Sequence, residues 1–152
     1  MTVTDKPRRE HALRVAVRSE RGSAAIEAVV IVPVMIPLLL LVIAGGQIAL
    51  ARQTVQAIAA DTARTASLQR TAPAAQKAAL ATAHHALDQQ VACIDRDVAL
   101  DLKAFATPVG TPASVSASIT CRVETLGLPG LPSVTVSATM RSPIDSYRGR
   151  QP

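Results

Sequence analysis

The pattern of apolar and polar residues divides the chain into three parts. A charged segment, residues 1–21, is followed by an apolar run in which, from Ala28 to Ala51, Gln47 is the only polar side chain. As a helix this run would be about 36 Å long, and the hydrocarbon core of a bilayer is about 30 Å thick. The pattern therefore predicts one membrane-spanning helix over 23–51 and a separate domain over 52–152.

The domain begins with helical periodicity. Gly and Pro are absent from Gln47 to Ala72, so the first helix is expected to continue to about Leu68. Its apolar stripe recurs at spacings of three and four: Val55, Ile58, Thr62 and Ala66. Pro73 predicts a break and a second helix over about 74–91. One face of that helix would carry Leu80, His84, Leu87 and Val91.

Strand patterns follow the second helix. Residues 115–123 and 134–140 alternate apolar residues with Ser, Thr and other polar residues, which predicts two strands with one apolar face each. Residues 93–102 are compatible with a further strand. The predicted fold is α+β: a long N-terminal helix that continues outward, a second helix and a small antiparallel sheet.

The remaining segments of the domain predict loops. Residues 103–113 contain two prolines and a glycine. Residues 126–132 join the last two strands, and this turn-rich loop is unusually apolar, so it would either pack on a helix or contact a partner. From about Ser142 the chain is polar and is expected to end as an unstructured tail.

The distribution of charge indicates the topology. Of the sixteen basic residues, which give a formal net charge of +5, six precede the apolar run: Lys6, Arg8, Arg9, Arg14, Arg18 and Arg21. Basic residues favour the cytoplasmic side, so residues 1–22 form a cytoplasmic leader, expected to lack stable structure, and the domain lies outside. Nucleic-acid binding is not indicated, because no aromatic platform or basic helix face accompanies the charge.

Glu27 is the residue that a plain anchor does not explain. It stands where the apolar run begins, five residues after Gly22. A charged side chain at the centre of a membrane helix costs about 2.5–3.5 kcal/mol, and less near the surface. An acid in this position therefore indicates a function, unless it simply lies at the level of the lipid headgroups.

The segment from Arg21 to Gln53, RGSAAIEAVVIVPVMIPLLLLVIAGGQIALARQ, resembles the N-terminal region of the TadE-like family of pilus-assembly pseudopilins. The resemblance implies that a prepilin peptidase cuts between Gly22 and Ser23 on the cytoplasmic face. It also implies that Glu27 pairs with the N-terminal amine of a neighbouring subunit during assembly. The implied partners are the lipid bilayer, the peptidase, other pilins or pseudopilins and the pilus secretion platform.

The spacing agrees chemically with that resemblance. Gly22 has no Cβ, so its backbone can enter a protease site in extended form. Cleavage would leave a positive amine on Ser23, four residues before Glu27 and on the same helix face. The alternative of a secreted domain released after Ala51 is minor, because the apolar run is longer than the 7–15 residues of a signal peptide.

Two further features of the run bear on helix packing. Pro33 and Pro37 each remove a helical hydrogen bond, and together they predict a kink or a locally melted turn, which membrane helices tolerate. Gly45 and Ala49 form a pair of small residues that permits close approach of another helix.

The two cysteines, Cys93 and Cys121, both fall in the part predicted to lie outside. An oxidising compartment favours a disulfide between them. Closing a loop of this size would contribute about 3–4 kcal/mol in the chain-entropy model. That is a large share for a domain whose apolar content is mainly Ala, Val and Leu.

No catalytic or metal-binding constellation is present in the sequence. The adjacent His84 and His85 would point about 100° apart on a helix and could not easily share a metal, so His84 is expected to be partly buried and structural. The acids Asp95, Asp97 and Asp101 lack the glycine and the glutamate of a calcium loop. We expect no cofactor and no enzymatic activity.

Two functional hypotheses remain from the sequence. The first is a minor pseudopilin of a Tad (Flp) type pilus or a related secretion machine, anchored in the cell membrane and assembled, in one possible outcome, into a surface pilus. The second is a permanently anchored single-pass membrane protein whose outer domain binds a partner. The sizeable domain separates this chain from the very short major pilins and favours a minor subunit.

Overall fold

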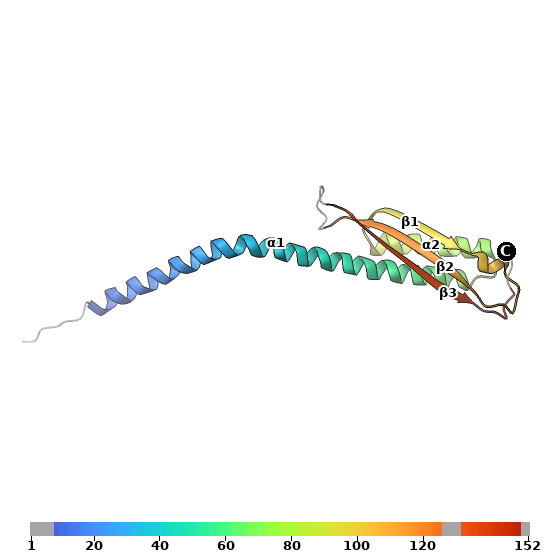
Figure 1. Ribbon diagram of the computed structural model, residues 1–152, viewed down its shortest axis with the longest axis horizontal. Coiled ribbons are helices and arrows are strands. Elements are labelled where there is room, and N and C mark those ends of the chain that lie inside the picture. The colour runs from blue at the N-terminus through green and yellow to red at the C-terminus, as the bar shows by residue number, and fades with distance from the viewer. Residues whose placement is uncertain (1–7, 126–131, 150–152) are drawn as a thin grey trace, which may run out of the picture. The chain divides into compact units, whose positions relative to one another are not determined.

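The computed structural model describes the backbone of residues 8–125 and 132–149, and the side chains from Ile26 onward within these ranges. The predicted α+β class is confirmed. The chain forms two compact units, one ending at Val42 and one beginning at Ile43. The elements in chain order are α1 (Arg8–Ser67), α2 (Ala72–Gln90), β1 (Cys93–Asp101), the 3₁₀ helix η1 (Lys103–Ala106), β2 (Ala113–Val123) and β3 (Val134–Ile144), as Figure 1 shows.

Helix α1 begins earlier in the chain than the sequence suggested. The expectation that the leader lacks structure is wrong from Arg8 onward, where the backbone is helical. No Gly or Pro occurs from Arg8 to Arg21. Propagating a nucleated helix is far easier than starting one, so nothing in that segment stops the helix of the apolar run from extending toward the N-terminus.

The second unit is a three-stranded antiparallel sheet with both helices on one face. The strand order is β1-β2-β3, and Ile119 pairs with Val98 on one side and with Ala138 on the other. Every second residue of β2 points to the helices and is buried: Val115, Ala117, Ile119, Cys121 and Val123. The opposite face is lined by Ser, Thr and charged residues, as the alternation predicted.

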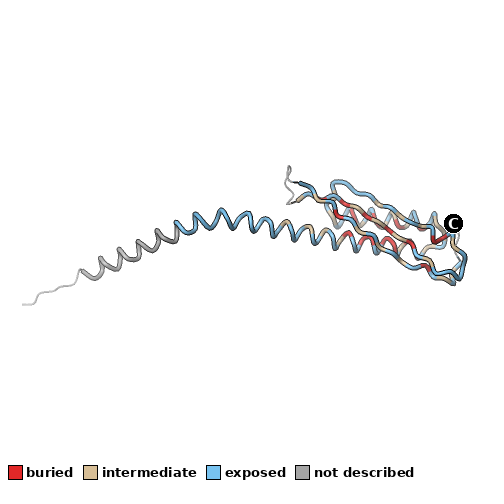
Figure 2. Tube along the Cα trace, in the orientation of Figure 1, coloured by how far each residue is buried: buried red, intermediate tan, exposed pale blue. Residues whose placement is uncertain are grey.

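Two apolar clusters form the core, shown in red in Figure 2. The first joins Val55, Ile58 and Ala59 of α1, Ala83 and Leu87 of α2, and residues of β2 and β3. The second lies at the other end of the sheet around Phe105 of η1. The predicted stripe on α1 is confirmed, because its four residues are all buried: Val55, Ile58, Thr62 and Ala66.

The buried face of α2 differs from the predicted one. Ala75, Ala79, Ala83 and Leu87 are buried, whereas His84 is exposed, so the expectation of a partly buried His84 is wrong. Alanine side chains allow a helix to lie close to the elements below it. The helix therefore turns its alanine stripe inward, and His84, about 100° around the helix from Ala83, points to solvent.

Two segments that were predicted to be loop or tail have regular structure. Residues 103–106 form η1, and its Phe105, the only phenylalanine, is only 2% exposed. Strand β3 continues to Ile144, so the unstructured tail does not begin at Ser142 as expected. Ile144 is buried in the same cluster as Phe105, and this burial favours the extra strand residues. The predicted apolar loop at 126–132 lies almost entirely outside the described residues.

Candidate functional site

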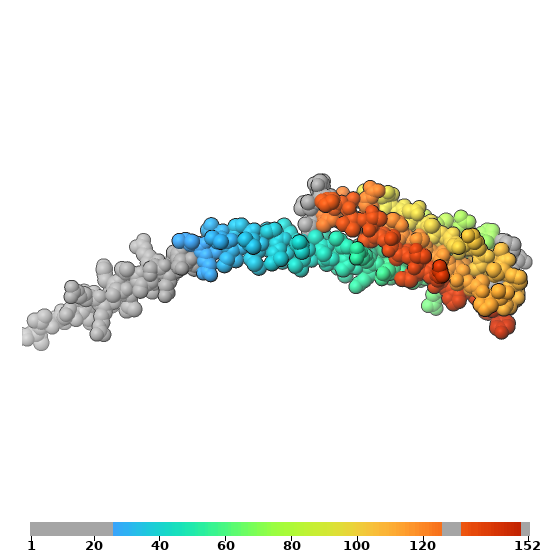
Figure 3. Space-filling view, in the orientation of Figure 1, coloured from blue at the N-terminus to red at the C-terminus, as the bar shows by residue number. Residues whose placement is uncertain are grey.

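The first part of the candidate site is the bare apolar surface of α1. Every residue from Ile26 to Val42 is exposed, with Val29 at 71% and Leu41 at 70%, and Figure 3 shows this segment in blue. So large an apolar surface requires lipid or protein around it. Helix α1 contains a segment long and apolar enough to cross a membrane, which fits a single-pass membrane protein.

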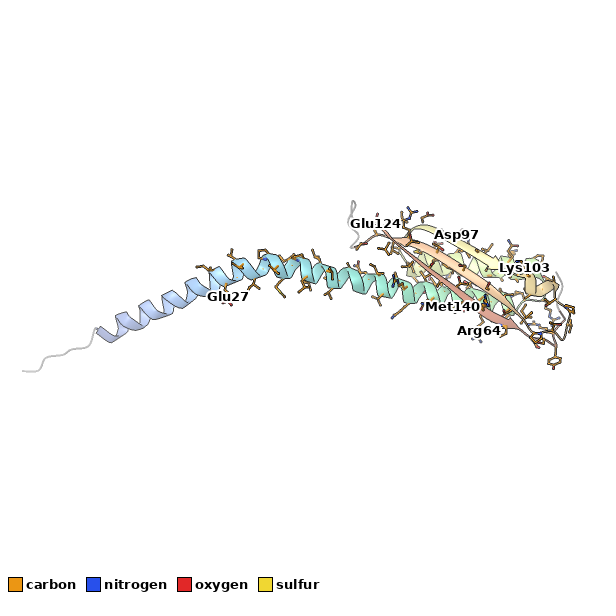
Figure 4. All side chains as sticks on the ribbon, in the orientation of Figure 1. Glu27, Arg64, Asp97, Lys103, Glu124 and Met140 are labelled. Carbon is orange, nitrogen blue, oxygen red and sulfur yellow. A yellow bond between two sulfur atoms is a disulfide. The ribbon has the colours of Figure 1, made fainter. Side chains whose placement is uncertain are left out.

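Glu27 lies within this apolar surface. Figure 4 shows its side chain extending from α1, and it is exposed. Among the described side chains it forms no ion pair. In a membrane, a carboxylate here would need a counter-charge from outside the described residues of its own chain.

The predicted cleavage junction lies inside α1 as far as the backbone is described. The backbone of Gly22 and Ser23 is helical, and the Ser23 side chain lies outside the described set. A peptidase that binds an extended substrate would therefore have to unwind the helix locally. Cleavage itself stays a prediction.

The prolines and glycines of the run are also placed. Helix α1 continues through Pro33 and Pro37, so no locally melted turn is seen, and a functional kink stays a prediction. At Gly45 and Gly46 an added Cβ would meet no atom within 4 Å. Neither glycine is required by a contact within the described chain, which leaves this stretch of α1 open to another helix.

The two cysteines form a disulfide, with Cα atoms 5.5 Å apart. The pairing of β1 with β2 shifts between Cys93 and Asp95, so Ile94 is an extra residue in a β-bulge. Without this bulge, the alternation that turns Val98 inward would turn Cys93 outward. The bulge thus returns Cys93 to the inner face, where it reaches Cys121.

One polar pair was not anticipated from the sequence. Arg96 of β1 forms a salt bridge and hydrogen bond with Asp88 of α2. The Arg96 guanidinium holds the pKa of the Asp88 carboxyl below its usual value, with smaller contributions from His84 and His85. The only signal in the sequence was an acid in the last turn of α2, eight residues before Arg96; that Arg96 faces α2 depends on the fold.

The three acids that were compared with a calcium loop lie on the surface. Asp95, Asp97 and Asp101 are exposed, and Asp95 pairs with Arg122 across the outer face at 3.5 Å. Within the described ranges, no group of three His, Cys, Asp or Glu side chains is arranged to hold a metal ion. The candidate site is therefore the exposed apolar surface of α1 that carries Glu27.

Comparisons with known proteins address the same region. No curated protein and no solved structure matches the chain. The family model described as TadE-like protein matches residues 22–64, which include the predicted junction, Glu27, the whole apolar run and the α1 residues of the first core cluster, Val55, Ile58 and Ala59. The resemblance predicted from the sequence is thereby confirmed over residues 22–64.

Proposed function

We propose that the chain is a minor pseudopilin of a Tad (Flp) type pilus or a related secretion machine. A prepilin peptidase would remove residues 1–22, and the mature protein would assemble through the helix that begins at Ser23. The TadE-like family indicates involvement in Tad pilus-related assembly. The bilayer, the peptidase, other pilins or pseudopilins and the secretion platform are the proposed partners, with the leader in the cytoplasm and the domain outside.

One observation carries this proposal: a carboxylate on an otherwise apolar, fully exposed helix surface. The residues from Ile26 to Val42 contact nothing that would bury them, so they are free to exchange lipid for neighbouring helices. Glu27 adds a single charge at one defined position along this helix. A charge that must find a counter-charge sets the register of helices that otherwise slide past one another.

The processing step is tested by the mass of the full-length protein extracted from membranes that contain the peptidase. Ser23 is the expected N-terminus. Replacing Gly22 with Leu should leave the leader intact, because a bulky side chain obstructs the extended backbone at the cut. The matched control is Gly46→Leu, at a glycine with open space around it, which should be processed normally. Intact leader in the wild-type protein would contradict the proposal.

The assembly step is tested separately with Glu27→Gln. This variant should be processed after Gly22 but should not sediment with filaments sheared from the cells, because the carboxylate that would pair with the neighbouring amine is lost. A processed wild-type protein that never leaves the membrane fraction would instead support the permanently anchored alternative.

A further inference from the structure

An apolar groove lies at one end of the second unit. It has a volume of about 580 Å³ and is lined by Ile48, Leu50 and Ala51 of α1, Val91 after α2, Ile94 of β1 and Val123 of β2. Leu50 is 65% exposed and Ile94 is 55% exposed. The polar residues of the lining, Gln47, Thr54, Gln90 and Glu124, are few.

The groove lies where the apolar run of α1 ends. Ile48 and Ala51 are among the last residues of that run, and both pack against the core cluster of the domain. The unit itself begins at Ile43, inside the predicted span. Within this unit, Ile48, Leu50 and Ala51 of the apolar run line the groove, so the groove lies at the level of the outer end of that run.

The sheet presents its apolar end at that same level. The first residue of β1, Cys93, pairs with the last of β2, Val123, which in turn pairs with the first of β3, Val134. Figure 4 shows Glu124 at this end and Lys103 at the other. Ile94 is the bulge residue, so it is not required by the regular pairing and projects as an exposed apolar side chain at the groove.

We propose that this end of the domain, from the groove to Ile94, is a lipid-binding surface that sits in the outer leaflet of the bilayer. Phospholipid acyl chains and the glycerol region would fill the groove. The hydrocarbon core of a bilayer is about 30 Å thick, and the headgroup regions on both sides bring the total to about 40–45 Å. The headgroup region of one leaflet is therefore deep enough for one layer of side chains. Apolar side chains commonly insert to this extent at membrane surfaces.

This surface requires only that α1 spans a bilayer, and it holds whether or not the chain is processed after Gly22. A neighbouring protein helix is the competing occupant. Lipid is favoured because the groove is lined by the last residues of the apolar run itself, so it meets lipid in every single copy of the inserted protein, before any assembly.

Fluorescence gives a direct test, because the chain contains no tryptophan. The full-length protein carrying Ile94→Trp is reconstituted at low density in phosphatidylcholine vesicles, with and without bromine on the acyl chains. The matched control is Val109→Trp. Val109 is 56% exposed and belongs to the opposite end of the sheet, where the Gly110 N–H donates to the Ser146 carbonyl.

The tryptophan at 94 should emit at shorter wavelength than that at 109 and should lose most of its emission on brominated lipid, whereas the tryptophan at 109 should be unaffected. Equal, unquenched emission from both would overturn the proposal. A blue-shifted but unquenched signal would show that protein covers the groove and would overturn it as well. Absence of free thiols verifies the fold, and Ala92→Trp, in the same groove lining, repeats the test if Ile94→Trp misfolds.

Discussion

At the scale of single residues, Thr62 shows how the helix pattern uses a polar residue in an apolar position. Its side chain is fully buried, and its Oγ1 has no hydrogen-bond partner among the described residues. The threonine fills its place in the stripe as a valine would. Its hydroxyl has nevertheless lost water without gaining a partner, which is unfavourable for the folded state.

Thr62→Val should therefore stabilise the protein, by about 1 kcal/mol, because it removes a buried unsatisfied hydroxyl at nearly constant volume. The measurement is the free energy of unfolding of the full-length chain in detergent. Thr54→Val is the control, since the Thr54 hydroxyl donates to the Leu50 carbonyl at 3.0 Å on a more accessible part of α1, and it should change stability by less. A loss of stability in Thr62→Val would mean that the hydroxyl has a partner after all.

At the scale of elements, the buried faces of the strands and of α1 followed from the sequence more closely than the buried face of α2 did. The alternation of apolar and polar residues identified β2 and β3 because each strand has one solvent-exposed and one buried face. Helix α2 is rich in alanine on several sides, so periodicity alone did not distinguish its inner face. The inner face of α2 is set by packing against the sheet, which depends on the tertiary structure.

The same limit applies to the candidate site. The apolar run and the TadE-like resemblance could be recognised because both depend on local order along the chain, whereas the roles of Gly22 and Glu27 stay predictions. The pair of Asp88 and Arg96 could not, since it depends on the register of β1 and on the bulge at Ile94. Phe105 was missed for a similar reason: its segment has the composition of a loop, and only the fold covers it.

The contact between α2 and β1 gives a pH prediction. Because Arg96 lowers the pKa of Asp88 in the folded state, the pair stabilises the protein above the unfolded pKa of about 3.9. That contribution is lost as the pH falls through the lower folded pKa. Both side chains are substantially exposed, at 41% and 58%, so the effect on stability is small.

The clearer measurement is the titration of the Asp88 carboxyl by NMR. Arg96→Gln should move its pKa upward toward the ordinary value, whereas Arg122→Gln, which removes the partner of Asp95, should leave Asp88 unchanged. An unaltered Asp88 titration in Arg96→Gln would show that the ion pair does not form in solution.

At the scale of the whole molecule, the domain combines a thin core with a covalent link. Alanine and valine dominate the two clusters, and such side chains bury little apolar area each. The disulfide spans a sequence separation of 28 residues and joins the first two strands at the groove end. In the chain-entropy model it contributes about 3–4 kcal/mol, which is comparable to much of the net stability of a small domain.

Replacing both Cys93 and Cys121 with Ser should accordingly lower the free energy of unfolding by about 3–4 kcal/mol. Reductant should lower the melting temperature of the wild-type protein toward that of the double variant and should not affect the variant itself. A wild-type melting temperature that does not respond to full reduction would show that the core suffices.

The disulfide also makes the stability of the domain depend on the redox state of its compartment. On the proposed topology the domain would leave the reducing cytoplasm, where the link cannot persist. Its thin core alone would then have to hold the fold until an oxidant outside joins Cys93 to Cys121. The link between β1 and β2 would thus make the proposed crossing difficult to reverse, because it stabilises the fold only in the outer compartment.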